Sequence, residues 1–93
     1  MNKIYIAGAI TGIENYRDIF KVAETRLISE GHICMNPSTL GEGFNQEDYM
    51  SICYRMMAVC NVIYMLKGWK NSIGAVKEYD YALRSCMEVI YEK

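Results

Sequence analysis

The chain has 93 residues, of which 52% are hydrophobic and 23% charged, with a formal net charge of −1. This composition is typical of a folded domain rather than a disordered segment, and the length predicts a single domain over residues 1–93. The balanced charge differs from the basic surface of a protein that binds duplex nucleic acid, and no apolar run approaches the ~20 residues of a membrane span. We therefore expect a cytoplasmic protein with neither a membrane nor a duplex nucleic-acid partner.

Two further expectations follow from size and from the cysteines. A chain this short buries little apolar surface alone, so we expect a homo-oligomer, a dimer or larger. The cysteines lack the spacing of metal ligands, which predicts free thiols in a reducing compartment and neither a metal site nor a cofactor. These residues are Cys34, Cys53, Cys60 and Cys86.

In chain order, the first predicted element is a buried strand at residues 3–8, a β-branched and aromatic run that ends at glycine. A loop then leads to a helix with Asn15 as its expected N-cap and Asp18 in a capping-box position. Gly31 is expected to end this helix in the left-handed conformation. The apolar face of the helix comprises Tyr16, Phe20, Ala23 and Leu27.

A second strand is predicted at residues 32–36, closed by Pro37 and followed by a loop at residues 38–44. Asn45 is the expected N-cap of the next helix, with Asp48 in its first turn. The spacing of the apolar residues predicts that one face of this helix is buried. That face comprises Tyr49, Ile52, Cys53, Met56, Met57 and Cys60.

The third strand, residues 62–66, is the most continuously apolar segment and is expected at the centre of the sheet. A loop precedes a third helix, capped by Ser72 or Asn71 and continuing to about Ser85, and residues 87–91 form a final strand. Alternating strands and helices with short connections predict an α/β fold. It has a parallel sheet of about four strands with helices on both faces.

In such sheets, ligands bind outside the carboxyl ends of the strands, which here are followed by loops 8–14, 37–45 and 67–73. Gly8 and Gly12 flank a turn that leads into a helix N-terminus, where backbone N–H groups favour an anion, and Arg17 follows in the first turn. Alternatively, the glycines serve a tight turn and Arg17 is solvated. The short motif does not decide between these interpretations.

The third helix offers a carboxylate next to a glycine. Gly74 and Glu78 are one turn apart on the same face, so the missing side chain at Gly74 leaves room for a ligand in front of Glu78. The alternative is a solvated carboxylate and a glycine that relieves packing. Trp69, in the preceding loop, could stack on a base or pack against a partner subunit.

Three segments in order, residues 3–12, 60–69 and 72–78, resemble the DUF4406 family over essentially the whole chain. That family is similar to the nucleoside 2-deoxyribosyltransferases and the 2′-deoxynucleoside 5′-phosphate N-hydrolases. The resemblance implies a flavodoxin-like sheet and oligomers whose subunits complete each other's pockets. It also implies cleavage of an N-glycosidic bond of a nucleoside or nucleotide through a glutamate nucleophile.

Carried onto this sequence, the resemblance implies that Glu78 is the nucleophile and that Tyr5 orients it. Ser72 and Gly74 would hold the phosphate or sugar end of the ligand, and Arg17 would lie near the phosphate. The loop over the deoxyribose would contain Gly8, Ile10 and Gly12.

Two positions depart from this pattern, because related sequences usually carry aspartate where this chain has Cys53 and Asn61. An acid that protonates the departing base or holds the sugar is then missing or moved, with Glu47 and Asp48 as the nearest substitutes. The expected function is an N-glycosidase or deoxyribosyltransferase. The alternatives are an inactive nucleotide-binding module that sequesters or senses its ligand, possible for a phage or mobile-element protein, and a purely structural oligomerisation unit.

Overall fold

The structure, a computed structural model, describes residues 1–93 and contains one sheet of four parallel strands in the order β2-β1-β3-β4. The strands are β1 (Lys3–Ala7), β2 (Ile33–Met35), β3 (Val62–Met65) and β4 (Glu88–Tyr91), and the helices are α1 (Tyr16–Ser29), α2 (Gln46–Ala58) and α3 (Ile73–Arg84). The predicted α/β fold is confirmed. The strand order 2-1-3-4 is consistent with a flavodoxin-like arrangement.

The register of the sheet places β1 and β3 at its centre. Tyr5 of β1 pairs with Met35 of β2 on one side and Ile63 of β3 on the other, and Ile63 pairs in turn with Val89 of β4. All four residues of β3 are buried, as its continuous apolar sequence predicted.

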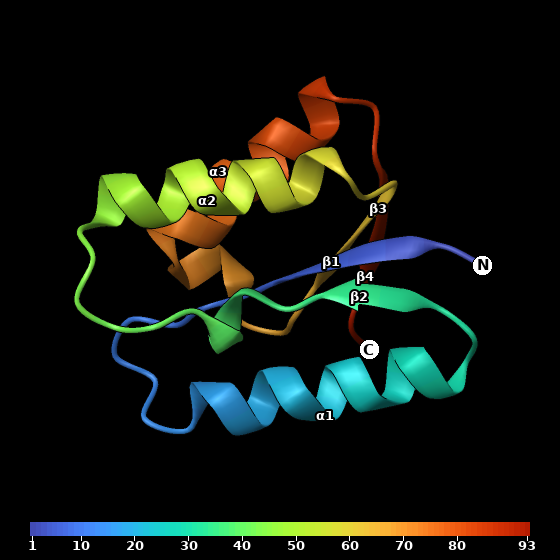
Figure 1. Cartoon of the computed structure of the whole chain (residues 1–93), viewed down its shortest axis with the longest axis horizontal. Coiled ribbons are helices and arrows are strands. Elements are labelled where there is room, and N and C mark those ends of the chain that lie inside the picture. The colour runs from blue at the N-terminus through green and yellow to red at the C-terminus, as the bar shows by residue number, and fades with distance from the viewer.

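Helices cover both faces of the sheet, with α1 on one side and α2 and α3 on the other (Figure 1). The residues of β1 alternate between these two layers, as the pleat of a strand requires. On the α1 side the buried residues are Ile4, Ile6, Phe20, Ala23, Leu27, Val62, Tyr64 and Leu66. On the other side they are Tyr5, Ala7, Cys53, Met57, Ile63, Met65 and Ala82.

The helix boundaries follow the predicted caps, with one exception. The side chain of Asn45 accepts a hydrogen bond from the N–H of Asp48, and Ser72 accepts one from Ala75, so α2 and α3 begin as expected. Gly31 ends α1 with a φ of +94°. Asn15 occupies the N-cap position of α1, but its side chain makes no capping bond because its backbone (φ −101°, ψ 31°) is not extended.

The face that α2 buries differs from the prediction. Met50 is buried beside Cys53 and Met57, whereas Ile52 is 37% exposed. The helix packs against both the sheet and α3, so its buried face is rotated relative to the face that the spacing of its apolar residues predicts. Residues 37–39 and 69–71, expected as loops, each form a short 3-10 turn. No helix has the length and apolarity needed to span a bilayer.

Candidate active site

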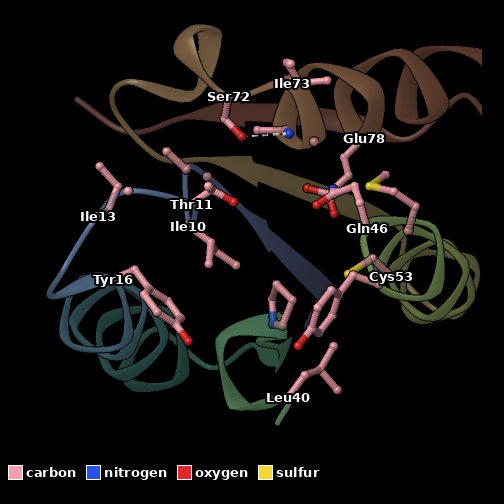
Figure 2. Close-up of a pocket in the computed structure, with 18 of the residues that line it drawn as sticks. Ile10, Thr11, Ile13, Tyr16, Leu40, Gln46, Cys53, Ser72, Ile73 and Glu78 are labelled. Carbon is pink, nitrogen blue, oxygen red and sulfur yellow. Dashed lines mark hydrogen bonds between the residues drawn. The ribbon is translucent and has the colours of Figure 1, made fainter. Parts of the chain in front are cut away.

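A cleft of about 1020 Å³ opens beyond the carboxyl end of β1, between the N-terminal ends of the three helices. All three predicted loops contribute to it, together with the first turns of α2 and α3. In Figure 2, Glu78, Gln46 and Cys53 lie on one side of this cleft, and Tyr16 lies on the other. The lining includes residues 8–14, Tyr16, Pro37, Leu40, Glu42, Gly43, Gln46, Tyr49, Met50, Cys53, residues 71–75 and Glu78.

The loop after β1 forms one wall of the cleft through Gly8, Ile10 and Gly12. A Cβ atom at Gly8 would lie 2.8 Å from Cδ1 of Leu66, so this glycine is required by packing under the loop. Gly12 has a φ of +81° and open space around it, so its requirement is for backbone conformation. Both glycines therefore have a structural reason to be present, and Ile10 supplies apolar surface to the cleft.

The N-terminus of α3 forms the opposite wall. Ser72 uses one lone pair of its hydroxyl to accept from the Ala75 N–H at 3.2 Å, which leaves the hydroxyl hydrogen free to donate into the cleft. A Cβ atom at Gly74 would lie 3.3 Å from Nε2 of Gln46 and 3.7 Å from Sδ of Met50. Because these neighbours also line the cleft, the glycine keeps this part of it open.

Glu78 stands one turn beyond Gly74 and is the buried carboxylate of the cleft, with 6% of its surface exposed. The hydroxyl of Tyr5, on β1, donates a hydrogen bond of 2.5 Å to its Oε2. The two residues are 73 positions apart in the chain, and the crossing of α3 over the sheet brings them together. The Cys53 thiol is a second neighbour of the carboxylate, and Oε1 is not engaged by Tyr5.

The surroundings of Glu78 alter its protonation. Burial raises the pKa of Glu78 from 4.5 to about 7, while the hydrogen bond from Tyr5 and the nearby Cys53 thiol oppose that rise by favouring the charged form. Burial likewise raises the pKa of Cys53 to about 11, so this thiol keeps its proton at neutral pH. Burial, and then the charge of Glu78, raise the pKa of Tyr5 well above 10.0.

Arg17 does not line the cleft, in contrast to the position near a phosphate that the sequence suggested. Its guanidinium donates to the carbonyl oxygens of Ser38 and Leu40 at 3.1 and 3.3 Å, and lies 3.9 Å from the carboxylate of Glu42. Since the donors of Arg17 face this loop, the residue ties α1 to residues 38–42.

The same loop is held from inside by Asn36, which the sequence analysis did not single out. The Oδ1 of this buried residue accepts from both the N–H and the hydroxyl of Ser38, at 2.9 and 2.7 Å, and its Nδ2 donates to Glu24. An asparagine directly before Pro37 was the available signal, because Asx side chains commonly organise such turns. Arg17 and Asn36 therefore shape one wall of the cleft without entering it.

Trp69 also lies outside the lining of the cleft. Its ring packs 4.6 Å from the ring of Tyr79 and 6.4 Å from that of Tyr91, and the ammonium of Lys70 lies 5.9 Å from its centroid. This packing places the indole in an aromatic cluster formed with α3 and β4, within the same chain. Base stacking by Trp69 is therefore not supported by its position.

The two departures from the aspartate pattern lie at opposite ends of the sheet. Cys53 faces Glu78 in the cleft. Asn61 precedes β3 at the amino end, where its Oδ1 accepts from the N–H of Lys3 at 2.7 Å and its Nδ2 donates to Asn2 at 3.1 Å. Asn61 thus joins β1 to β3, and only the change at Cys53 concerns the cleft.

Several lining residues were missed or assigned to the core. Tyr49, expected in the apolar face of α2, lines the cleft, and its hydroxyl donates to the carbonyl of Gly41 at 2.6 Å. Gln46 and Met50 flank the space in front of Gly74. The sequence feature that could have indicated these lining residues is the Asn45 cap, because it places the first turn of α2 next to the sheet edge where the ligand loops meet.

Comparison with known proteins gives one match. The model of a family described as "Domain of unknown function (DUF4406)" matches residues 2–91. No curated protein and no solved structure matches the chain.

Proposed function

This chain belongs to the DUF4406 family, and from the geometry of its cleft we propose that it binds a nucleoside or nucleotide and cleaves its N-glycosidic bond through Glu78. The product sugar passes either to water, as in a 2′-deoxynucleoside 5′-phosphate N-hydrolase, or to a second base, as in a nucleoside 2-deoxyribosyltransferase. The resemblance of residues 3–12, 60–69 and 72–78 to these enzymes supports the proposal alongside the site itself.

The observation that carries the proposal is the environment of Glu78. A carboxylate with 6% exposure lies in a cleft, held on one oxygen by a tyrosine and open in front because residue 74 is glycine. A surface carboxylate needs none of these features. A nucleophile needs a fixed orientation and space for the sugar in front of it.

In the proposed reaction, Oε1 of Glu78 attacks the anomeric carbon while the bond from that carbon to the base breaks and its electrons leave with the base. The product is a glycosyl ester of Glu78. Water or a second base then attacks the same carbon from the face that the first base vacated, so configuration is retained. Tyr5 fixes the carboxylate and stabilises its charged form, and the loop that holds Ile10 covers the sugar.

The decisive experiment is an assay of base release by chromatography, using a panel of nucleosides, deoxynucleosides and their 5′-monophosphates. Glu78→Gln keeps the shape of the side chain and removes the nucleophile, so we expect its rate to fall by at least ~10³-fold. The matched control is Asp80→Asn, an exposed carboxylate on the same helix that pairs with Arg84. Equal rates in wild type and Glu78→Gln would refute the proposal.

The second candidate is a binding protein that holds the same ligands without turnover. The observation in its favour is Cys53, a neutral thiol beside Glu78 at a position where the resemblance implies an acid. A ligand that binds only the folded state raises the melting temperature, so a thermal shift with no base release would select this candidate. If neither a thermal shift nor base release is observed, the remaining candidate is the structural oligomerisation unit.

A further inference from the structure

The first turn of α2 places the side chain of Gln46 at the space in front of Gly74. A Cβ atom added at Gly74 would lie 3.3 Å from Nε2 of Gln46 and 4.0 Å from Oγ of Ser72. In Figure 2, Gln46 lies on the same side of the cleft as Glu78. The space that the missing side chain of Gly74 leaves for a ligand is therefore bordered by the Gln46 amide.

The amide of Gln46 is free to bind a ligand. No hydrogen bond joins it to the neighbouring residues of the cleft, whereas the hydroxyl of Tyr49 donates to the carbonyl of Gly41. The other two α2 side chains on this wall, Met50 and Cys53, offer a thioether and a thiol, which form only weak hydrogen bonds. An amide both donates and accepts, so it can bind a sugar hydroxyl with either its nitrogen or its oxygen turned toward the ligand.

The stereochemistry of the proposed reaction decides which part of the substrate faces Gln46. Glu78 attacks the anomeric carbon on the face of the sugar opposite the base. In a β-nucleoside, the 2′- and 3′-hydroxyls lie on that same face, whereas the base and C5′ lie on the other. Because Gln46 and Glu78 lie on one side of the cleft, the Gln46 amide faces the hydroxyls of the sugar rather than the base.

Of the two hydroxyls, the 3′-hydroxyl is the one that a neighbour of Glu78 reaches. C2′ is bonded to the attacked carbon, so the 2′-hydroxyl lies directly at the carboxylate. C3′ is one bond further away, toward the space around the nucleophile. The Gln46 side chain borders that space where Gly74 leaves it open. Ribonucleosides and 2′-deoxynucleosides both carry the 3′-hydroxyl, so both can make this contact.

From these observations we infer that Gln46 binds the 3′-hydroxyl of the sugar and so determines specificity for nucleosides that carry it. The inference rests on the proposed function, because it concerns the same cleft and the same nucleophile. The hydrogen bond holds the sugar with its anomeric carbon in front of the Glu78 carboxylate. A substrate without the 3′-hydroxyl leaves the amide unpaired and loses this orientation.

The test removes the two partners of this hydrogen bond separately and together. Base release is measured for the 2′-deoxynucleosides of adenine, guanine, cytosine and thymine and for the matching 2′,3′-dideoxynucleosides, each also as its 5′-monophosphate. The proteins are wild type and Gln46→Leu, which keeps the size of the side chain and removes its polar atoms. Residue 46 is exposed at the start of α2, so the variant should fold. The measured quantity is the ratio of kcat/KM between the two sugars, because comparing this ratio between proteins cancels their difference in intrinsic reactivity.

We expect loss of the 3′-hydroxyl to lower kcat/KM about tenfold more in wild type than in Gln46→Leu, which is the size of one hydrogen bond. The matched control is Glu47→Leu, which introduces the same side chain at the next residue of α2, outside the cleft lining, and should keep the wild-type ratio. A parallel comparison of ribonucleosides with 2′-deoxynucleosides should give the same ratio in wild type and Gln46→Leu, because the 2′-hydroxyl is not the partner of the amide.

The outcomes separate the inference from the proposed function. Equal 3′-hydroxyl ratios in wild type and Gln46→Leu, with base release that still depends on Glu78, would overturn the inference and leave the proposed function intact. A change confined to the 2′-hydroxyl ratio would also overturn it. Base release that persists in Glu78→Gln, or no release from any substrate, would overturn both.

Discussion

The two faces of strand β1 show how differently one short segment can be used. Ile4 and Ile6 point toward α1 into a hydrophobic layer with Phe20, whereas Tyr5, between them, points toward α2 and α3 and donates to the buried carboxylate of Glu78. Both layers exclude water. One uses burial for stability, and the other uses it to hold a reactive group whose burial costs stability. Removing a large side chain from the α1 layer should therefore lower stability and leave activity unchanged, whereas removing the carboxylate of Glu78 should raise stability and abolish activity.

The largest effect is expected on the apolar face. Phe20→Ala removes a side chain that is 1% exposed, which should lower the free energy of unfolding by about 3–5 kcal/mol. Urea denaturation at low temperature measures it, with Val22→Ala on the exposed side of the same helix as the control. Activity per folded molecule should be unchanged. A loss of activity larger than the loss of folded protein would show that the two faces are coupled.

On the other face, removing the carboxylate should stabilise the protein. Because burial raises the pKa of Glu78 from 4.5 to about 7, the unfolded state ionises first and stability falls as pH rises between these values. Glu78→Gln should therefore raise the free energy of unfolding by about 3 kcal/mol at pH 8 and by almost nothing below pH 4.5. The measurement is urea denaturation at both pH values. The same gain at both would exclude ionisation of Glu78 as the cause.

Tyr5→Phe tests the link between the strand and the carboxylate. The lost hydrogen bond to a charged group should lower the free energy of unfolding by about 1.5–3 kcal/mol at pH 8, and by less at pH 4, where Glu78 is neutral. It should also raise the pKa of Glu78, because this bond favours the charged form. The acid limb of the pH–rate profile would then move to higher pH, with kcat/KM about tenfold lower at pH 7. An unmoved limb would show that Tyr5 is only structural.

The smallest effect on stability is expected at Gly74. Its backbone is helical, which favours alanine, whereas the close contact of the added Cβ with Gln46 opposes that gain, so Gly74→Ala should change the free energy of unfolding by no more than about 1 kcal/mol. The added methyl, 3.3 Å from Nε2 of Gln46, would fill the space in front of Glu78 and lower activity. Gly41→Ala, with open space around it and no place in the cleft lining, is the control. Full activity in Gly74→Ala would mean that this space is not used by the ligand.

Local patterns in the sequence predicted most of the fold. The β-branched runs, the Asn45 and Ser72 caps and the left-handed Gly31 depend on neighbours in the chain, and the structure agrees at each. The exceptions are instructive. Asn15 has the right residue type for a cap, but its backbone is not in the extended conformation that a cap needs. The buried face of α2 depends on the contact of this helix with α3.

The order of the elements can be predicted from the sequence, and with it the parallel sheet and the edge where the loops meet, because these follow from periodicity, caps and chain connectivity. Which of the candidate residues share the cleft depends instead on the packing of the helices on the sheet. It placed Tyr5 on Glu78 across 73 residues, directed Arg17 to Ser38, and packed Trp69 against Tyr79. The direction in which a side chain points depends on how helices cross the sheet, and the spacing of residues along the chain does not determine that crossing.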